Sequence, residues 1–190
     1  IIKDFSFEIN AGEMVAISGP SGKGKSSLLY TIGMLHNDYK GKFTILGNVN
    51  PKIDSKIGNK LLKEDISFVF QNYALIDNKT VRQNLKIAQK ISKNNIDIVE
   101  ALKTVGLSDK IDAKIVELSG GEQQRVALAR VLIKDSKIIL ADEPTGSLDE
   151  NNRNMVLKIF ALLQKRNITI LIVTHDNYIK GICDRVIELW

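Results

Sequence analysis

The fold of this chain is decided by residues 14–26, which read Met14-Val15-Ala16-Ile17-Ser18-Gly19-Pro20-Ser21-Gly22-Lys23-Gly24-Lys25-Ser26. The first five residues are a short apolar run before a glycine-rich turn, which predicts a buried strand. The other eight match the phosphate-binding pattern G-x-x-x-x-G-K-[ST], and a helical sequence follows, as this loop requires. The stretch therefore predicts a nucleotide phosphate site, although kinases and GTPases share the same loop.

Each part of this loop has a chemical role in holding a phosphate. Gly22 and Gly24 let the backbone fold closely around an anion, and the successive amides and the helix N-terminus present partial positive charge to it. Lys25 is placed to reach the β- and γ-phosphates, and the hydroxyl of Ser26 to bind Mg²⁺. The predicted ATP-binding residues are Gly19, Pro20, Ser21, Gly22, Lys23, Gly24, Lys25, Ser26 and Ser27.

A pair of carboxylates follows a second apolar strand, predicted over residues 137–141. Asp142 suits a direct or outer-sphere partner of Mg²⁺ beside the phosphate loop. Since side chains alternate along a strand, we expect the adjacent Glu143 to point toward the γ-phosphate. There Glu143 would polarise the attacking water as general base.

Strand and helix patterns alternate along the chain. This alternation predicts an α/β fold, a phosphate-loop NTPase core with a mainly parallel sheet covered by helices. Residues 72–133 interrupt it with helical periodicity, so we expect an inserted helical subdomain between core segments 1–71 and 134–190 of one domain. The other predicted strands span 42–46, 66–70, 168–173 and 185–189, and the predicted helices begin at Ser26 or span 80–91, 96–105 and 150–165.

Composition excludes several classes of protein. A chain of 190 residues with 44% hydrophobic and 26% charged residues is neither disordered nor fibrous. The net charge of +5 is spread along the chain, which favours a solvated lysine-rich surface over a nucleic-acid stripe, so no nucleic-acid partner is expected. The single cysteine, Cys183, is interpreted as a buried structural thiol. No run approaches the roughly 18 apolar residues of a membrane span, so we expect another polypeptide to supply any spans.

A third motif is Leu118-Ser119-Gly120-Gly121-Glu122-Gln123-Gln124-Arg125. Ser119 and Glu122 form a capping box at the start of a helix, and the two glycines leave free amides for a second anion site. This stretch resembles the signature motif of ABC ATPases. The resemblance extends over essentially the whole chain.

Further residues match the family pattern in order. Gln71 resembles the glutamine that contacts Mg²⁺ and water and couples the site to the helical subdomain. His175 resembles the switch histidine that contacts the γ-phosphate. The resemblance implies a catalytic set of Glu143, His175 and Gln71, with Mg²⁺ held by Ser26, Gln71 and Asp142. The loop expected to cross a dimer interface comprises Ser147, Leu148 and Asp149.

The resemblance also implies a homodimer that forms on ATP binding. Signature residues of one subunit would close over the ATP held by the other subunit's phosphate loop, and hydrolysis would reopen the dimer. These residues are Ser119, Gly120, Gly121 and Glu122. Three features depart from the family pattern. Lys23 stands where a small residue is common, the adenine-stacking aromatic would precede Ile1, and the usual C-terminal extension is missing, so we expect both ends to be truncated.

Residues 141–149 resemble an ABC subgroup that serves macrolide, lipoprotein, antimicrobial-peptide and bacteriocin export or cell-division signalling. Residues 72–75 look closest to bacteriocin-type exporters. The resemblance implies an ATPase subunit that works with a separate transmembrane permease at the cytoplasmic face of the cell membrane. Two alternatives remain open: a soluble ABC ATPase acting on ribosomes or nucleic acid, and a regulatory subunit that signals to a membrane partner.

Overall fold

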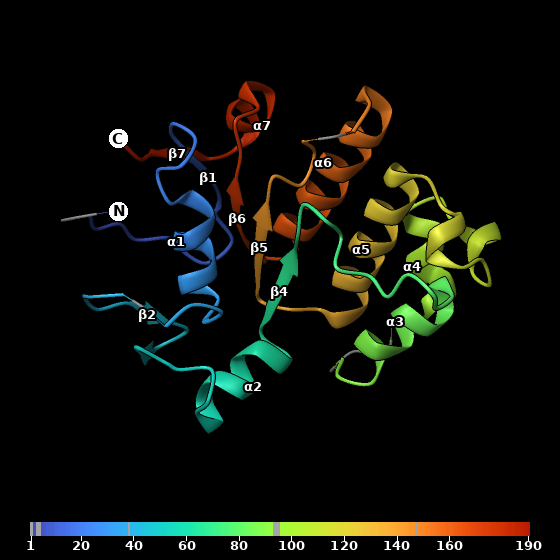
Figure 1. Ribbon diagram of the computed structural model, residues 1–190, viewed down its shortest axis with the longest axis horizontal. Helices are drawn as coiled ribbons and strands as arrows, with labels where there is room; N and C mark the ends of the chain where they lie inside the picture. The colour runs from blue at the N-terminus through green and yellow to red at the C-terminus, as the bar shows by residue number, and fades with distance from the viewer. Residues whose placement is uncertain (1, 3–4, 38, 93–95, 147) are drawn as a thin grey trace.

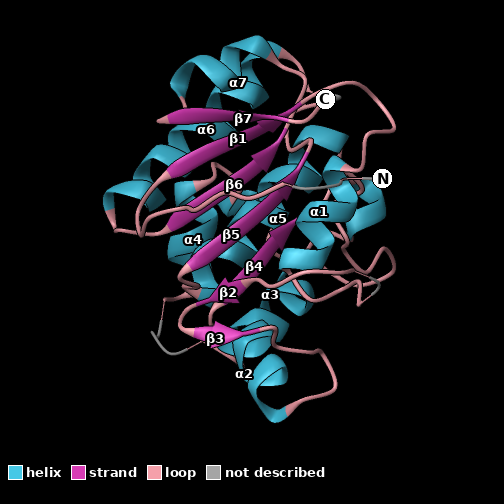
Figure 2. Cartoon of the chain, turned by 90° about the vertical axis from the view of Figure 1, so that its left-hand side faces the viewer, coloured by secondary structure: helices cyan, strands magenta, loops and turns pink. Residues whose placement is uncertain are grey.

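The central sheet has five parallel strands in the order β4-β5-β6-β1-β7. The computed structural model describes residues 2, 5–37, 39–92, 96–146 and 148–190. Figure 2 shows the strands side by side in this order, with helices on both faces. The strands are β1 (Met14–Ser18), β4 (Ile66–Val69), β5 (Ile138–Asp142), β6 (Thr169–Val173) and β7 (Arg185–Glu188). The predicted α/β fold with a mainly parallel sheet is confirmed.

The sheet separates two hydrophobic cores, because successive side chains of a strand point to opposite faces. In β5, Ile139 and Ala141 join one core while Leu140 joins the other. The same alternation divides Ile170 and Leu171 of β6. Both faces of the inner strands are covered, which explains why these strands read as continuous apolar runs rather than as polar-apolar repeats.

The two faces are covered by different parts of the chain (Figure 1). Helix α1 (Lys25–Ile32) and helix α2 (Lys56–Glu64) pack on one face, where Leu29 and Leu61 are buried. Helices α5 (Gly120–Lys134), α6 (Glu150–Lys165) and α7 (Asn177–Ile182) pack on the other. Helix α6 places the fully buried Phe160 there.

Between β4 and β5 the chain forms a helical block. It consists of α3 (Val81–Gln89), α4 (Ile98–Thr104), the short 3-10 helices η1 (Ser108–Lys110) and η2 (Ile115–Glu117), and α5. Helix α5 packs against α3, α4 and β4, so it joins this block to the sheet. One hydrophobic core runs through both parts, and the division into two subdomains at residues 71 and 134 stays a prediction.

Three local features differ from the sequence prediction. The strand expected over 42–46 is half of an antiparallel hairpin, β2 (Thr44–Ile45) and β3 (Asn48–Val49). Leu46 and Gly47 both have positive φ (48° and 77°), the tight turn that reverses the chain there. Helices α2 and α7 are additional. Helix α7 has only six residues, too few for a clear periodic pattern, whereas α2 is strongly amphipathic and was not recognised in the sequence. No helix within the described ranges is long and apolar enough to span a bilayer.

Candidate active site

The phosphate loop connects the end of β1 to the start of α1, as predicted. Gly19 has a φ of 146° and lies so close to the end of the chain that a Cβ there would overlap the carbonyl oxygen of Leu189. Gly24 precedes α1 with a φ of 88°, a left-handed conformation that favours glycine. Both glycines are therefore required by the backbone path of the loop, before any ligand is considered.

Lys25 is buried at the first position of α1, with 6% of its surface exposed. Its ammonium donates to the carbonyl oxygens of Gly19 and Pro20, both at 2.9 Å. Among the residues that the structure describes, no carboxylate pairs with Lys25. A buried cation whose partners are neutral carbonyls, beside the amides of a helix N-terminus, is well suited to accept an anionic phosphate.

Ser26, Asp142 and Tyr30 form a hydrogen-bonded group beside the loop. The Ser26 hydroxyl donates to Oδ1 of Asp142 at 2.9 Å, and the Tyr30 hydroxyl donates to Oδ2 at 2.6 Å. Burial and the hydrogen bond to Asp142 raise the pKa of Tyr30 to about 12, so this hydroxyl remains a donor at neutral pH. Sequence reasoning missed Tyr30, although its spacing of four residues from Ser26 places both on one face of α1.

The oxygen donors of this group fit Mg²⁺. A hydroxyl and a buried carboxylate within 2.9 Å of each other match the hard oxygen ligands that Mg²⁺ takes beside nucleotide phosphates. Ser26 and Asp142 would hold the ion. Gln71, the third predicted ligand, is exposed immediately after Phe70 and has no contact with this pair in the described hydrogen bonds.

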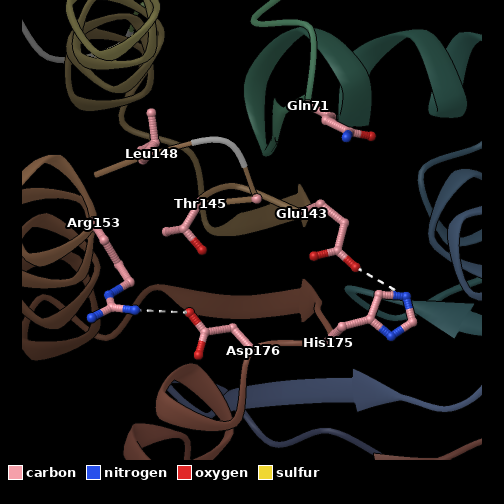
Figure 3. Close-up of a pocket in the computed structure, with 8 residues that line it drawn as sticks. Gln71, Glu143, Thr145, Leu148, Arg153, His175 and Asp176 are labelled. Carbon is pink, nitrogen blue, oxygen red and sulfur yellow. Dashed lines mark ion pairs between the residues drawn. The ribbon is translucent and has the colours of Figure 1, made fainter. Parts of the chain in front are cut away.

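A cleft of about 640 Å³ lies beside this group, where β4, β5 and β6 end. Figure 3 shows Glu143 and His175 pointing toward each other on one side of the cleft, with 3.4 Å between Oε1 of Glu143 and Nε2 of His175. The cleft is lined by Gln71, Glu143, Thr145, Gly146, Leu148, Arg153, His175 and Asp176. The structure therefore brings together the three predicted catalytic side chains, which come from three separate segments of the chain.

Asp142 and Glu143 diverge for a different reason from the one expected. Strand β5 ends at Asp142, and Glu143 has a left-handed backbone with a φ of 44°. Its amide still donates to the carbonyl of Val173 at 2.9 Å, so the chain turns while it remains attached to the next strand. The turn, rather than strand alternation, directs Glu143 into the cleft.

Two charged residues of the cleft escaped the sequence analysis. Arg153 of α6 lies 3.6 Å from Asp176, and its guanidinium stacks over the ring of Tyr178 at 5.1 Å from the centroid. Figure 3 shows this pair on the side of the cleft away from Glu143. No sequence motif includes these residues. Their contacts arise from the packing of α6 against the turn after β6, which the sequence alone does not indicate.

The signature residues form a capped helix start, separate from the phosphate loop. Ser119 caps α5 by accepting from the amide of Glu122 at 3.3 Å, while Glu122 accepts from the amide of Ser119 at 2.8 Å. The hydrogen bond from the Ser119 amide lowers the pKa of Glu122. Ser119 and Gly120 are exposed, so these two residues are accessible to another molecule.

The predicted dimer loop is described in part. Leu148 lines the cleft, and Asp149 caps α6 by accepting from the amide of Asn152 at 2.9 Å. Ser147 lies outside the described residues. Neither the phosphate loop nor the signature residues line the cleft.

Comparisons with known proteins identify the family of the chain. A family model described as ABC transporter matches residues 2–146. Macrolide export ATP-binding/permease protein MacB of Salmonella choleraesuis is 40% identical over 194 residues, which cover all of this chain and 30% of that protein. The MacB protein of Chlorobium phaeobacteroides is 44% identical over 191 residues, covering 98% of this chain and 29% of that protein. The chain thus spans about three tenths of the length of the curated relatives it matches.

Solved structures show the same architecture. A dimeric post-hydrolysis state of the ATP-binding cassette MJ0796 bound to ADP and Pi superposes with a TM-score of 0.86 at 33% identity, covering 96% of this chain and 83% of that one. The structure of cbiO1 from Clostridium perfringens, part of the ABC transporter complex cbiONQ, gives a TM-score of 0.80 at 31% identity, with coverage of 98% and 77%. The chain is therefore a member of the ABC transporter family and one of its ATPase cassettes.

Proposed function

We propose that this chain binds ATP with Mg²⁺ and hydrolyses it to power an export system for a peptide, lipoprotein or drug-like substrate. The observation that carries the proposal is the cleft in which Glu143 and His175 face each other, beside a phosphate loop whose buried Lys25 has no acidic partner among the described residues. The relatives named macrolide export proteins support the export role, with a drug-like substrate.

The residues present account for the chemistry of hydrolysis. Lys25 and the loop amides bind the β- and γ-phosphates, and Ser26 and Asp142 hold Mg²⁺, which neutralises charge on the phosphate oxygens when bound. Glu143 accepts a proton from water as the water oxygen bonds to the γ-phosphorus and the bond to the bridging oxygen breaks. His175 donates a hydrogen bond to the γ-phosphate, and Gln71, which lines the same cleft, orients the water.

The exposed signature start supports a homodimer with two shared ATP sites. Ser119, Gly120 and Gly121 of one subunit would contact the γ-phosphate bound by the other, while Leu148 and Asp149 would line the interface. The cassette structures described as dimeric support this arrangement. In this proposal, ATP holds the dimer closed and hydrolysis releases it, which would move a membrane-bound partner.

The partner we propose is a separate permease at the cytoplasmic face of the membrane. The MacB relatives carry both functions in their name and are more than three times as long as this chain, which supports coupling of such a cassette to a permease. A regulatory cassette that signals to a membrane protein is the second candidate, since the same closing motion serves both roles.

Copurification tests the proposal. The full-length protein is affinity-tagged in its native cell, solubilised in mild detergent and analysed by mass spectrometry. A multispanning permease at equal stoichiometry, or spans on the same polypeptide, supports the transporter, and transport by reconstituted vesicles separates transport from signalling. Ribosomal proteins or nucleic acid without any membrane protein would contradict the export role and favour a soluble ABC ATPase.

A further inference from the structure

The side chain of Asn152 lies between the signature helix α5 and the start of α6. Its Nδ2 donates to Oδ2 of Asp149 at 2.5 Å, and its Oδ1 accepts a short hydrogen bond from Arg125 on α5. The chemistry of these partners fixes the orientation of the amide, because a guanidinium can only donate and an ionised carboxylate can only accept. Asn152 therefore connects two segments that are 24 residues apart, through both ends of one amide.

Gly121 of the signature motif contacts the same amide. A Cβ at this position would lie 2.6 Å from Cγ and 2.8 Å from Oδ1 of Asn152. Gly121 is inside α5 and its φ is not positive, so the backbone conformation does not require a glycine there. The space for Asn152 is thus one physical reason for a glycine at position 121, in addition to any approach of a phosphate.

The amide has little freedom to move away from Gly121. The Asn152 backbone amide also donates to Oδ1 of Asp149 at 2.9 Å, which fixes its main chain at the first turn of α6. The amide hydrogen bonds from residues 152 and 151 lower the pKa of Asp149, so its carboxylate stays ionised as their acceptor. A shift of the side chain would break its hydrogen bonds to Asp149 and Arg125 together.

We propose that Asn152 is a positioning residue that couples the signature helix to the loop at Leu148 and Asp149 within one subunit. The inference rests on the proposed function, in which both segments face the second subunit of an ATP-bound dimer. A displacement of either segment then moves the other. The two ATP sites of the dimer are thereby conformationally coupled through the contacts of Asn152 inside each subunit. Truncating Asn152 would leave ATP binding to the monomer intact and weaken dimer closure.

The test is a double-variant cycle in a Glu143→Gln background, in which ATP-bound dimers should accumulate. Dimer affinity is measured by light scattering with ATP, and monomer ATP affinity is measured at low protein concentration. We expect Asn152→Ala to weaken the dimer about tenfold, as the loss of a charged hydrogen-bond pair implies, with monomer affinity unchanged. The exposed neighbour provides a matched control, since Asn151→Ala should leave both affinities unchanged.

Gly121→Ala supplies the decisive comparison. Alone it should weaken the dimer more than Asn152→Ala, because its methyl group displaces the amide. Combined with Asn152→Ala, the Gly121→Ala dimer should recover to the affinity of Asn152→Ala alone, since the methyl group then has room. Combined with Asn152→Asp, which has the same size and repels Asp149, it should not recover.

Two outcomes would overturn the proposal, and they differ. If Gly121→Ala with Asn152→Ala dimerises no better than Gly121→Ala alone, Asn152 is not what requires the glycine and the coupling is wrong. If the Glu143→Gln parent itself forms no ATP-dependent dimer, the proposed function fails and the coupling fails with it. Denaturant midpoints of the nucleotide-free variants show whether the Gly121–Asn152 contact exists in either case.

Discussion

The hydroxyl of Ser26 and the carboxylate of Asp142 are 2.9 Å apart, although 116 residues separate them in the chain. Ser26 lies in the first turn of α1, which follows β1, whereas Asp142 is the last residue of β5. Strand β6 lies between those two strands in the sheet. Helix α1 crosses this face of the sheet and places Ser26 against the end of β5, which joins the phosphate loop to the proposed Mg²⁺ ligand.

Tyr30 donates to the second oxygen of the Asp142 carboxylate, so its contribution to the proposed Mg²⁺ site can be measured. Tyr30→Phe removes one hydroxyl and keeps the ring contacts with His36 and Phe70. Loss of this charged hydrogen bond, worth about 1.5–3 kcal/mol, frees Asp142 to rotate, so nucleotide binding should require several-fold more Mg²⁺. Calorimetric titration with a non-hydrolysable ATP analogue at varied Mg²⁺ measures the shift.

Binding of the nucleotide without Mg²⁺ should be the same in Tyr30→Phe and the wild type. Tyr39→Phe is the matched control, because Tyr39 packs on Phe43 elsewhere. An unchanged Mg²⁺ requirement in Tyr30→Phe would show that its hydroxyl does not hold Asp142 for the metal.

Lys25→Ala should remove nucleotide binding. The ammonium is the buried cation of the loop, and its loss leaves phosphate charge without a partner. At about 3 kcal/mol for a charged hydrogen bond, affinity should fall about 100-fold. Fluorescent-nucleotide titration measures it. Lys23→Ala is the control, since Lys23 is expected to contribute to the loop mainly through its backbone and its side chain is exposed. It should change affinity by less than about threefold, and equal losses in both variants would contradict the assigned role of Lys25.

The capping box gives a prediction for pH. The folded-state pKa of Glu122 is lowered, so its stabilisation is present above the unfolded pKa of about 4.3 and is lost as pH falls through the lower folded value. Glu122→Gln keeps an acceptor oxygen but not the charge, so it should destabilise the fold by about 0.5–1 kcal/mol at pH 7. The difference should vanish once the pH lies below the lowered folded pKa, as urea unfolding at pH 7 and at a pH well below ~4 would show. A difference that is the same at both values would mean that the charge contributes nothing.

Ser119→Arg should separate dimer closure from nucleotide binding. The arginine adds bulk and positive charge at an exposed helix start and removes the cap, at a cost of about 1 kcal/mol in stability. Monomer ATP affinity should stay within about twofold, because Ser119 does not contact the phosphate loop in the described structure. Light scattering in the Glu143→Gln background should show no dimer, whereas Ser119→Thr keeps the hydroxyl and should dimerise. Dimers of wild-type affinity from Ser119→Arg would place the interface elsewhere.

Long apolar strands and periodic helices were predictable from the sequence because one local pattern determines each of them. Strand β1 and helix α6 have the predicted bounds. The hairpin at Thr44–Val49 was not predicted. Its two strands have two residues each on either side of the turn at Leu46 and Gly47, which is too short for a polar-apolar alternation to be recognised. Helix α7 was missed because six residues make fewer than two helical turns, whereas α2 is amphipathic and was predictable from the sequence.

The motifs predicted which segments form the site, and tertiary packing determines the rest. Gln71, Glu143 and His175 line one cleft, as three strand ends of a parallel sheet at one edge would suggest. The left-handed turn at Glu143 is a backbone feature that no residue pattern indicated. Tyr30 and Asn152 make their contacts across long sequence separations or between packed helices, so no local motif identifies them.

The most direct test of the account is the turnover of Glu143→Gln. Glutamine keeps the size of the side chain and loses the basic carboxylate, and general-base catalysis is worth about 10²–10⁴-fold. ATP hydrolysis measured by phosphate release should fall at least about 100-fold, while ATP affinity is retained and ATP-bound dimers accumulate. If Glu143→Gln hydrolyses ATP at the wild-type rate, Glu143 is not the base and the cleft that it shares with His175 is not the catalytic site.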